Sequence, residues 1–263
     1  MNNLVLFDVD GTLTEARDAI SVRMLKALRE LCRYAEIGFL TGSGLEYIKE
    51  QLWPALNDPI IKQNSHLLPC NGTEYVITDG IEELIFNHIS KASMEDEIGD
   101  GSMRELLKLL CEMQAQVVQE YSIPLTGNFI QNRGSMVNWC PIGRAAKGEA
   151  REAFLLLDEQ LGIRRKYFDI LSKEIASRKI GLTLKLGGDT SFDIYPNGWD
   201  KTYAFKHFNE HDWNFWFVGD RCYPQGNDYE IFEHLKHTGR AFETSGPQET
   251  IEIIDFHILR DML

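Results

Sequence analysis

The sequence predicts an α/β protein built on a parallel sheet, with an α+β module inserted into the chain. Two short apolar runs near the N-terminus, at 4–7 and 37–40, are each followed by apolar residues at helical spacing. Strand, helix, strand, helix is the order typical of a parallel sheet. A third apolar run, at 215–218, stops at Gly219-Asp220 and indicates that the sheet is completed near the C-terminus.

The first elements follow from the spacing of apolar residues. The run at 4–7 stops at an acid, as a strand buried in a parallel sheet would. Residues 21–34 then carry helical periodicity, 37–40 predict a second buried strand, and a second helical stripe begins at Leu45. The residues at helical spacing are Val22, Leu25, Leu28 and Cys32 in the first helix and Leu45, Ile48 and Leu52 in the second.

The middle of the chain has a different pattern. Apolar spacing predicts one helix that includes 103–117 and another over 165–178. Apolar and polar residues alternate over 182–186 and again over 191–195, which is typical of half-buried antiparallel strands. We therefore expect a core domain made of residues 1–85 and 196–263, with a cap domain of residues 86–195 inserted into it.

Composition restricts the class of partner. The formal net charge is −13, from 27 Lys and Arg against 40 Asp and Glu. Nucleic acid and anionic membranes both favour basic proteins, so we expect neither as a partner. No apolar run approaches the roughly 18–20 residues of a membrane span, and the first apolar run is too short for a signal peptide. The five cysteines form no CxxC pair, which favours reduced thiols and a cytoplasmic protein.

Two carboxylates follow the first predicted strand. Asp8 and Asp10 lie in the segment Asp-Val-Asp-Gly-Thr, directly after the apolar run. Ligands of open parallel sheets bind beyond the carboxyl ends of the strands, where these acids lie. One carboxylate of such a pair can attack phosphorus and bind metal, while the other donates and accepts protons. The alternative is a turn with two solvated acids.

Two further acids follow the strand at 215–218. Asp220 lies in a Gly-Asp pair and Asp228 in a Gly-Asn-Asp triplet. Together with the first two acids they would complete a site of hard oxygen ligands suited to Mg²⁺. The triplet could instead be an Asx turn that enters a helix.

Three other polar residues could contact a phosphate. Lys201, in Gly-Trp-Asp-Lys, could neutralise a phosphoryl oxygen, although a solvated lysine is the simpler interpretation. Thr41 or Ser43 offers a hydroxyl at a strand end with glycine neighbours, whose backbone N–H groups could bind phosphate. The sequence leaves open which of these two hydroxyls would act.

In this order, these motifs resemble the haloacid dehalogenase superfamily of phosphotransferases, which has a Rossmann-like parallel-sheet core. The resemblance implies that Asp8 is the nucleophile, which becomes an aspartyl-phosphate, and that Asp10 is the general acid and base. It further implies that Asp8, the Asp10 carbonyl and Asp220 bind Mg²⁺. Asp228 would assist this site, and Lys201 would shield charge on the transferred group.

The predicted cap adds basic and polar residues to this set. Arg144, Lys147 and Arg151 would share one face if their stretch were helical, although such a stripe can also be solvated. Ser191 and Asp193 share a strand face, where they could hydrogen-bond sugar hydroxyls or face water.

Four stretches are similar to eukaryotic-type phosphomannomutases. They are DVDGTLTEAR, NRGSMVNWCPIGRAAKGEAR, GGDTSFDIYPNGWDK and GDRCYPQGNDYEIF. The spacing of the arginines in the second stretch and the distance from SFD to GWDK both match the family pattern. The residues that the resemblance implies for phosphosugar binding are Arg17, Arg133, Arg144, Arg151, Ser191 and Asp193.

The resemblance implies a phosphohexomutase that interconverts mannose 6-phosphate and mannose 1-phosphate, in mannose metabolism towards GDP-mannose. A hexose 1,6-bisphosphate would serve as intermediate and activator, and it must turn over so that either phosphate can meet Asp8. The arginines would bind the phosphate that is not reacting. The family also implies a cap that closes to exclude water and a homodimer formed through the caps.

The chain departs from the family pattern at several positions. Thr41 stands where glycine is usual, and Cys70 where an acid is usual. His234 and His237 replace residues that hold a second cation in relatives, and imidazoles are poor ligands for so hard an ion. The alternatives to a mutase are a Mg²⁺-dependent sugar-phosphate phosphatase on the same scaffold and a non-catalytic phosphosugar-binding module. A module of that kind would tolerate loss of the two N-terminal acids, and both are present.

Overall fold

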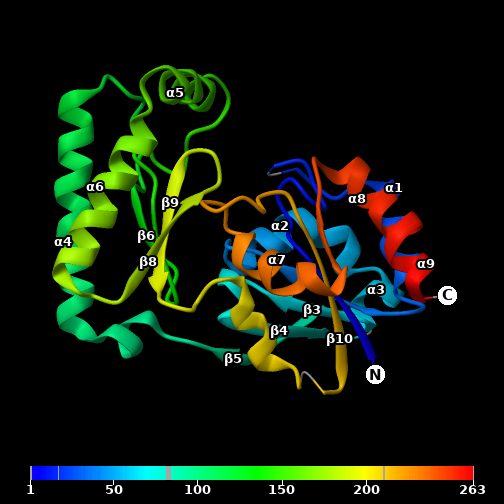
Figure 1. Ribbon diagram of the computed structural model, residues 1–263. Helices are drawn as coiled ribbons and strands as arrows, with labels where there is room; N and C mark the ends of the chain where they lie inside the picture. The colour runs from blue at the N-terminus through cyan, green and yellow to red at the C-terminus, as the bar shows by residue number, and fades with distance from the viewer. Residues whose placement is uncertain (1, 17, 81–83, 210, 263) are drawn as a thin grey trace. The chain divides into compact units, whose positions relative to one another are not determined.

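The computed structural model describes residues 2–16, 18–80, 84–209 and 211–262 (Figure 1). The chain divides into two compact units. Met1–Lys91 and Trp199–Leu263 form the first, called here the core unit, and Ala92–Gly198 form the second, called the cap unit. The chain therefore leaves the core unit once and returns to it once, as an inserted module does.

A mixed sheet forms the centre of the core unit. Its strands are β1 (Asn2–Phe7), β2 (Glu36–Leu40), β3 (Ser65–Leu68), β4 (Glu74–Asp79), β5 (Ile85–Lys91), β10 (Trp213–Gly219) and β11 (Ala241–Glu243). Among the described residues, their spatial order is β11-β10-β1-β2-β3-β4-β5. Strands β11 to β3 run parallel, and β4 and β5 are antiparallel to their neighbours. Because β5 pairs with β4, the core unit extends beyond the edge expected near residue 86.

The central strand β1 is buried on both faces. Val5 and Phe7 belong to one hydrophobic cluster, and Leu4 and Leu6 to another. All four side chains are fully buried, which is why this strand has a continuous apolar sequence without alternation. The parallel centre of the sheet therefore has a hydrophobic layer on each side.

Helices supply the other half of each layer. The core unit contains α1 (Val22–Leu31), α2 (Leu45–Leu56), α3 (Pro59–Gln63), α7 (Tyr229–Leu235), α8 (Pro247–Ile253) and α9 (Leu259–Met262). Three 3₁₀ helices, η1 (Cys70–Gly72), η2 (Lys201–His207) and η3 (Lys236–Thr238), and one π-helix, η4 (Ile254–Ile258), complete the helical segments described in this unit. Helices α1, α2, α3 and α8 share the cluster of Val5, and η2 and α7 share that of Leu4.

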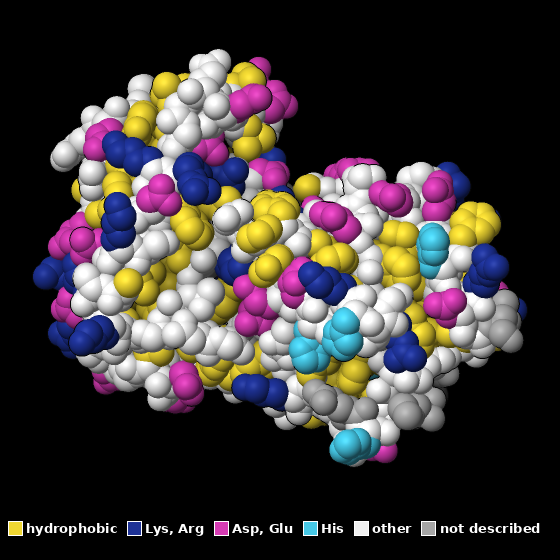
Figure 2. All heavy atoms as spheres, in the orientation of Figure 1, with side chains coloured by type: hydrophobic (Ala, Val, Ile, Leu, Met, Phe, Trp, Pro, Cys, Tyr) yellow, Lys and Arg dark blue, Asp and Glu magenta, His cyan; other side chains and the backbone are white. Residues whose placement is uncertain are grey.

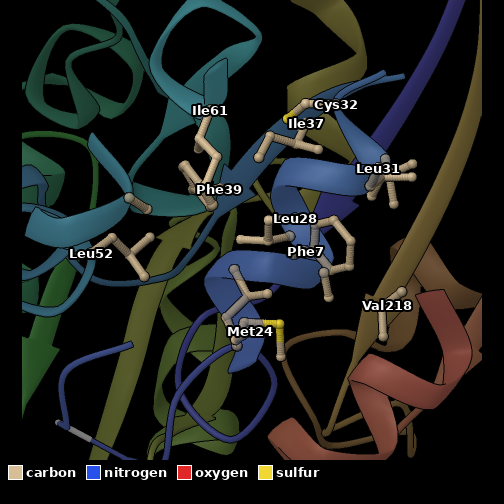
Figure 3. Packing of buried hydrophobic residues seen from close by; sticks show 14 of the residues in the cluster. Phe7, Met24, Leu28, Leu31, Cys32, Ile37, Phe39, Leu52, Ile61 and Val218 are labelled. Atoms are coloured by element: carbon tan, nitrogen blue, oxygen red, sulfur yellow. The ribbon is translucent and has the colours of Figure 1, made fainter. Parts of the chain in front are cut away.

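Helix α1 illustrates how the sequence specifies these elements. Ser21 caps its N-terminus, where the Ser21 hydroxyl accepts a hydrogen bond from the Met24 N–H at 3.2 Å. The apolar face of α1 packs on the sheet, and Figure 3 shows Leu28 beside Phe7, with Val218 of β10 in the same group. The cap and the apolar stripe together account for the helix expected over 21–34.

The cap unit consists of an antiparallel sheet and three longer helices in the part of the chain described. Its strands are β6 (Ile130–Asn132), β7 (Val137–Trp139), β8 (Leu182–Gly187) and β9 (Ser191–Pro196), in the spatial order β6-β7-β9-β8. Its helices are α4 (Met94–Glu120), α5 (Gly148–Leu161) and α6 (Ile163–Arg178). Trp139 stacks on Phe192 with ring centroids 4.9 Å apart, and Tyr167 of α6 packs edge-on against Trp139. This aromatic group fixes one face of the sheet against a helix.

Two expectations for the cap are wrong in detail. The alternation over 182–186 predicts an exposed polar side for that strand, but its Lys185 has an exposed fraction of 7% and lies opposite Asp193 in the register of β8 and β9. Arg144 and Lys147 do not share a helical face with Arg151, because α5 begins at Gly148. Both errors arise because a pattern of polar residues does not reveal what packs over it.

The fold class predicted from the sequence is confirmed. A parallel-dominated sheet with helices on both faces and a separate antiparallel sheet with helices constitute the expected α/β core and α+β cap. Within the described ranges, the structure contains no helix with the length and apolar character of a membrane span.

Candidate active site

The site begins where β1 ends. The Asp8 N–H donates a 3.0 Å hydrogen bond to the Val218 carbonyl of the neighbouring strand β10, and this bond aligns the ends of the two strands. Gly11 then turns the chain with a φ of +80°, and a Cβ there would lie 2.5 Å from Asp220 Oδ2. Glycine at this position therefore allows the Asp8 loop and Asp220 to approach closely.

Three carboxylates and one ammonium group meet at these strand ends. One oxygen each from Asp8, Asp220 and Asp228 lie within 4.8 Å of one another. Lys201 donates to Asp8 Oδ1 and also, at 2.5 Å, to Asp228 Oδ1. The Lys201 side chain has no exposed surface, so the interpretation of a solvated lysine is wrong. Asp200 caps η2 through the Thr202 N–H and thereby fixes where Lys201 begins that turn.

Burial and mutual repulsion dominate the electrostatics. Burial raises the pKa of Asp8 well above its ordinary value, against the attraction of Lys201. Burial also raises the pKa of Asp220 to about 6, and the adjacent Asp228 adds to this rise. Burial alone would lower the pKa of Lys201, but Asp228 and Asp8 outweigh it and raise that pKa. The cluster carries more negative than positive charge, and it would gain from a bound cation.

The free oxygens of the cluster fit a magnesium ion. Asp220 Oδ1 is buried and has no hydrogen-bond partner. Asp228 already accepts from Lys201 through Oδ1 and from the Arg221 N–H, at 3.0 Å, through Oδ2. Asp8 and Asp220 are therefore the carboxylates best placed to bind the ion, and Asp228 holds Lys201 in position. Hard oxygen donors are what Mg²⁺ prefers, so the residues present suit it.

Asp10 does not join this cluster through its side chain. Its Oδ1 accepts a hydrogen bond of 2.9 Å from Gln51 Nε2, and the Thr14 hydroxyl donates to Gln51 Oε1 at 3.3 Å. Because Thr14 fixes the amide orientation, the NH₂ group of Gln51 must face the carboxylate. The sequence reasoning missed Gln51, although it lies three residues after Ile48 on the buried face of α2, which is an available signal.

The phosphate-binding loop expected after β2 is held by the turn η1. The Cys70 N–H donates to the Ser43 carbonyl at 2.9 Å, and the Asn71 N–H donates to the Thr41 carbonyl at 2.8 Å. The Thr41 hydroxyl accepts from the Ser43 N–H at 3.1 Å and keeps its own proton for another acceptor. The structure therefore leaves Thr41 and Ser43 both as candidates. Asn71 Nδ2 also donates to the Trp199 carbonyl at 3.2 Å, two residues before Lys201.

A second polar group lies on the cap sheet around Asn138. The Asn138 amide nitrogen donates to Ser191 Oγ at 3.0 Å and to Asp193 Oδ1 at 2.7 Å. Arg144 donates to Asn138 Oδ1 at 3.0 Å, and Arg133 donates to Asp193 Oδ1 at 3.5 Å. The structure thus brings together four of the predicted phosphosugar residues. Asn138 itself was missed, although a lone polar residue between Val137 and Trp139 marks the second face of a strand.

Of the remaining predicted residues, Arg151 stands apart from this group. Arg151 pairs with Asp189 in the turn between β8 and β9, at 2.5 Å. Arg17 lies outside the described residues. His234, expected to weaken a second cation site, packs against the ring of Phe205 with centroids 5.1 Å apart.

A family model described as eukaryotic phosphomannomutase matches residues 24–260. The chain belongs to the eukaryotic phosphomannomutase family. It is 33% identical over 260 residues to a phosphomannomutase of Dendrobium officinale, covering 97% of this chain and 94% of the relative. It is 34% identical to a phosphomannomutase of Oryza sativa subsp. indica, covering 95% and 93%. The predicted membership of this enzyme family is confirmed.

The fold of this family member is shared with distant proteins. The structure aligns with an IMP-nucleotidase of Plasmodium falciparum at a TM-score of 0.66 and 15% identity, covering all of this chain and 67% of the other. So low an identity shows the fold alone. The shared fold agrees with the α/β core and inserted α+β cap that the sequence predicted.

Proposed function

We propose that this enzyme interconverts mannose 6-phosphate and mannose 1-phosphate through an aspartyl-phosphate on Asp8. The observation that carries the proposal is the buried group of Asp8, Asp220, Asp228 and Lys201 at the end of β1, in a chain of the phosphomannomutase family. Lys201 binds one oxygen of Asp8 and holds the carboxylate in one orientation. One Asp8 oxygen could then bind the metal while the other attacks phosphorus.

The metal of the proposal is Mg²⁺, held by Asp8, Asp220 and the Asp10 carbonyl. When bound, it would neutralise charge on the phosphoryl oxygens and favour the ionised form of Asp8. Lys201 adds a second positive charge from the protein itself. Asp228 accepts a hydrogen bond from the Lys201 ammonium group and holds it beside Asp8.

Asp10 is the proposed general acid and base. Its carboxyl group must give a proton to the leaving oxygen when protonated and, once ionised, take one from the attacking hydroxyl. Gln51 donates to Asp10 Oδ1 and so fixes the orientation of the carboxyl group that would transfer the proton. Gln51 thus acts as a positioning residue.

The phosphate that is not reacting is assigned to the arginines of the cap unit. Arg133 and Arg144 are held beside Asp193, Ser191 and Asn138, so cationic donors and sugar-hydroxyl partners occur together. Arginine binds phosphate in a bidentate manner, and each such contact is charge-assisted. A hexose 1,6-bisphosphate has two phosphates, and this chain has one set of phosphate-binding groups on each unit. This correspondence favours a mutase over a phosphatase.

We also propose a homodimer that forms through the cap unit. A hollow of about 570 Å³ lies between α4 and the edge strand β6, and the exposed Val118 and Leu125 are among its lining residues. Because β6 has only β7 beside it in the described sheet, its outer edge is available for a second copy of the chain. The remaining lining residues are Cys111, Gln114, Ala115, Gln119, Phe129 and Ile130.

A coupled assay tests the proposed reaction. Wild-type enzyme with Mg²⁺ should convert mannose 1-phosphate to mannose 6-phosphate, and glucose 1,6-bisphosphate should stimulate this conversion. Asp8→Asn should lose both isomerisation and hydrolysis while its circular dichroism spectrum stays unchanged. Release of inorganic phosphate without any bisphosphate-stimulated isomerisation would identify a capped phosphatase and reject the mutase.

A further inference from the structure

The turn between β8 and β9 places a carboxylate on one of the cap arginines. Arg151, in the first turn of α5, donates from Nη2 to Asp189 Oδ2 at 2.5 Å. Its Nε is buried and has no hydrogen-bond partner. The side chains of Arg151 and Asp189 keep 22% and 36% of their surface exposed, so a ligand can reach the pair.

The other two arginines are held differently. Arg144 donates to a neutral amide oxygen, that of Asn138. Arg133 lies 3.5 Å from Asp193 Oδ1, an oxygen that Asn138 Nδ2 also approaches, at 2.7 Å. Arg151 has instead a short, charge-assisted contact with a carboxylate from a turn.

A phosphate that binds Arg151 must therefore compete with Asp189. The guanidinium would exchange one charge-assisted hydrogen bond for another, and the Asp189 carboxylate would repel the phosphate at close range. The face of the cap unit in Figure 2 likewise shows Lys and Arg side chains beside Asp and Glu side chains. Arg151 thus adds less to the affinity for phosphate than an arginine without an acidic neighbour would add.

We propose that Asp189 is an internal competitor for the phosphate bound by Arg151, and that it promotes release of that phosphate during turnover. This inference rests on the proposed mutase function. A hexose bisphosphate that turns over within one catalytic cycle must leave its remote phosphate site without leaving the enzyme. As the phosphate leaves, Asp189 forms its hydrogen bond with Arg151 again, so that the guanidinium always has an anionic partner.

The test is the variant Asp189→Asn, which keeps a neutral acceptor for Arg151 and removes the charge. Calorimetry with mannose 1-phosphate as the probe measures binding, and the coupled assay measures isomerisation. We expect the dissociation constant to fall about three- to tenfold, because a repulsive charge near a partly exposed arginine is removed. We expect kcat to fall as well, since release of the remote phosphate becomes slower, while KM also falls.

Two further variants separate this role from general effects. Glu105→Gln removes a carboxylate from another cap arginine, Arg178, and should change neither binding nor kcat. In an Arg151→Ala background, Asp189→Asn should no longer tighten binding, because the competition acts through that arginine. Circular dichroism of each variant checks the fold.

The outcomes are distinct. Unchanged or weaker binding by Asp189→Asn would overturn the proposal and leave Asp189 as a residue that orients Arg151. Tighter binding that persists without Arg151, or that comes with unchanged kcat, would also overturn it. Failure of the mutase function shows itself separately, as absence of bisphosphate-stimulated isomerisation in the wild type. The calorimetric comparison would in that case still decide the competition between Asp189 and the phosphate.

Discussion

At the scale of single residues, the buried charges at the ends of β1 and β10 govern the site. Asp8, Asp220 and Asp228 contribute three carboxylates, and Lys201 provides a single buried ammonium group. Burying such a cluster of charges costs free energy unless each charge has a partner of opposite sign. We expect both magnesium binding and the stability of the protein to depend on this balance.

Magnesium should stabilise the folded protein through Asp220. With the ion at a hundred times its dissociation constant, mass action adds about 2.7 kcal/mol, which is roughly 5–10 °C in Tm for a chain of this size. The shift should be lost in Asp220→Asn, whose unpartnered oxygen belongs to the site, and kept in the exposed control Asp212→Asn. Thermal unfolding after chelation and again with Mg²⁺ measures it. An undiminished shift in Asp220→Asn would remove that residue from the metal site.

Replacing Lys201 with Met should destabilise the protein strongly. The change leaves the carboxylates of Asp8 and Asp228 buried without their cation, which costs about 3–5 kcal/mol for a buried ion pair. Lys206→Gln, an exposed lysine of the same turn, should cost less than about 1 kcal/mol. Urea denaturation without metal compares them. Equal free energies of unfolding would mean that the buried ammonium group contributes no more than a surface lysine.

Residues such as Asp8 and Asp220 could be predicted because each follows a buried apolar run, and strand ends gather at one edge of a parallel sheet. Gln51 and Asn138 could not be assigned in the same way. A glutamine on a helix or an asparagine on a strand is ordinary at a surface, and only tertiary packing shows that these two amides are buried against Asp10 and Asp193. The role of such an amide side chain depends on the residues that pack against it, which the sequence does not reveal.

At the scale of elements, the turn η1 links two parts of the site. Its backbone holds the Thr41 loop, its Asn71 amide holds the Trp199 carbonyl, and His207 of η2 donates to the Gly72 carbonyl at 2.6 Å. Gly72 also packs on η2 so closely that a Cβ would lie 2.9 Å from the Ala204 Cα. The position of η2, and with it Lys201, depends on this contact.

Gly72→Ala should therefore damage both stability and turnover. Its φ of +79° adds backbone strain of about 1 kcal/mol, and the overpacked contact with Ala204 adds about 1–3 kcal/mol. Gly239→Ala is the matched control, because Gly239 has a similar φ of +73° but no atom within 4 Å of its Cβ position. Denaturation curves give the free energies of unfolding of the two variants, and kcat should fall only in Gly72→Ala. Matching losses in the two variants would mean that the contact with η2 is unimportant.

Elements were predictable where a hydrophobic pattern existed. Helix α1 has both a cap and an apolar stripe, and β10 has a continuous apolar run. Strand β5 was not predicted, since nearly all of its residues are exposed and only its pairing with β4 makes it a strand. The start of α5 at Gly148 was also missed, because an arginine stripe resembles a helical face whether or not the backbone is helical.

At the scale of the whole molecule, the hollow beside β6 predicts self-association. Leu125→Asp places a charge in that apolar lining and should convert the proposed dimer into a monomer, because burying an unpaired carboxylate is costly. Leu156→Asp is the control, since Leu156 is equally apolar, is exposed on α5 and does not line the hollow. Sedimentation velocity gives the oligomeric state. A dimer that survives Leu125→Asp would place the interface elsewhere.

The pairing of β1 with β10 sets a condition on the order of events during synthesis. Asn2 aligns with Trp213, so β1 lacks one neighbour until β10 has been synthesised. The cap unit, by contrast, is one continuous segment that can assemble as soon as it has emerged. The nascent chain thus holds Asp8 at the edge of an unfinished sheet, and the group of Asp8, Lys201, Asp220 and Asp228 forms only after β10 and the residues that follow it have been added.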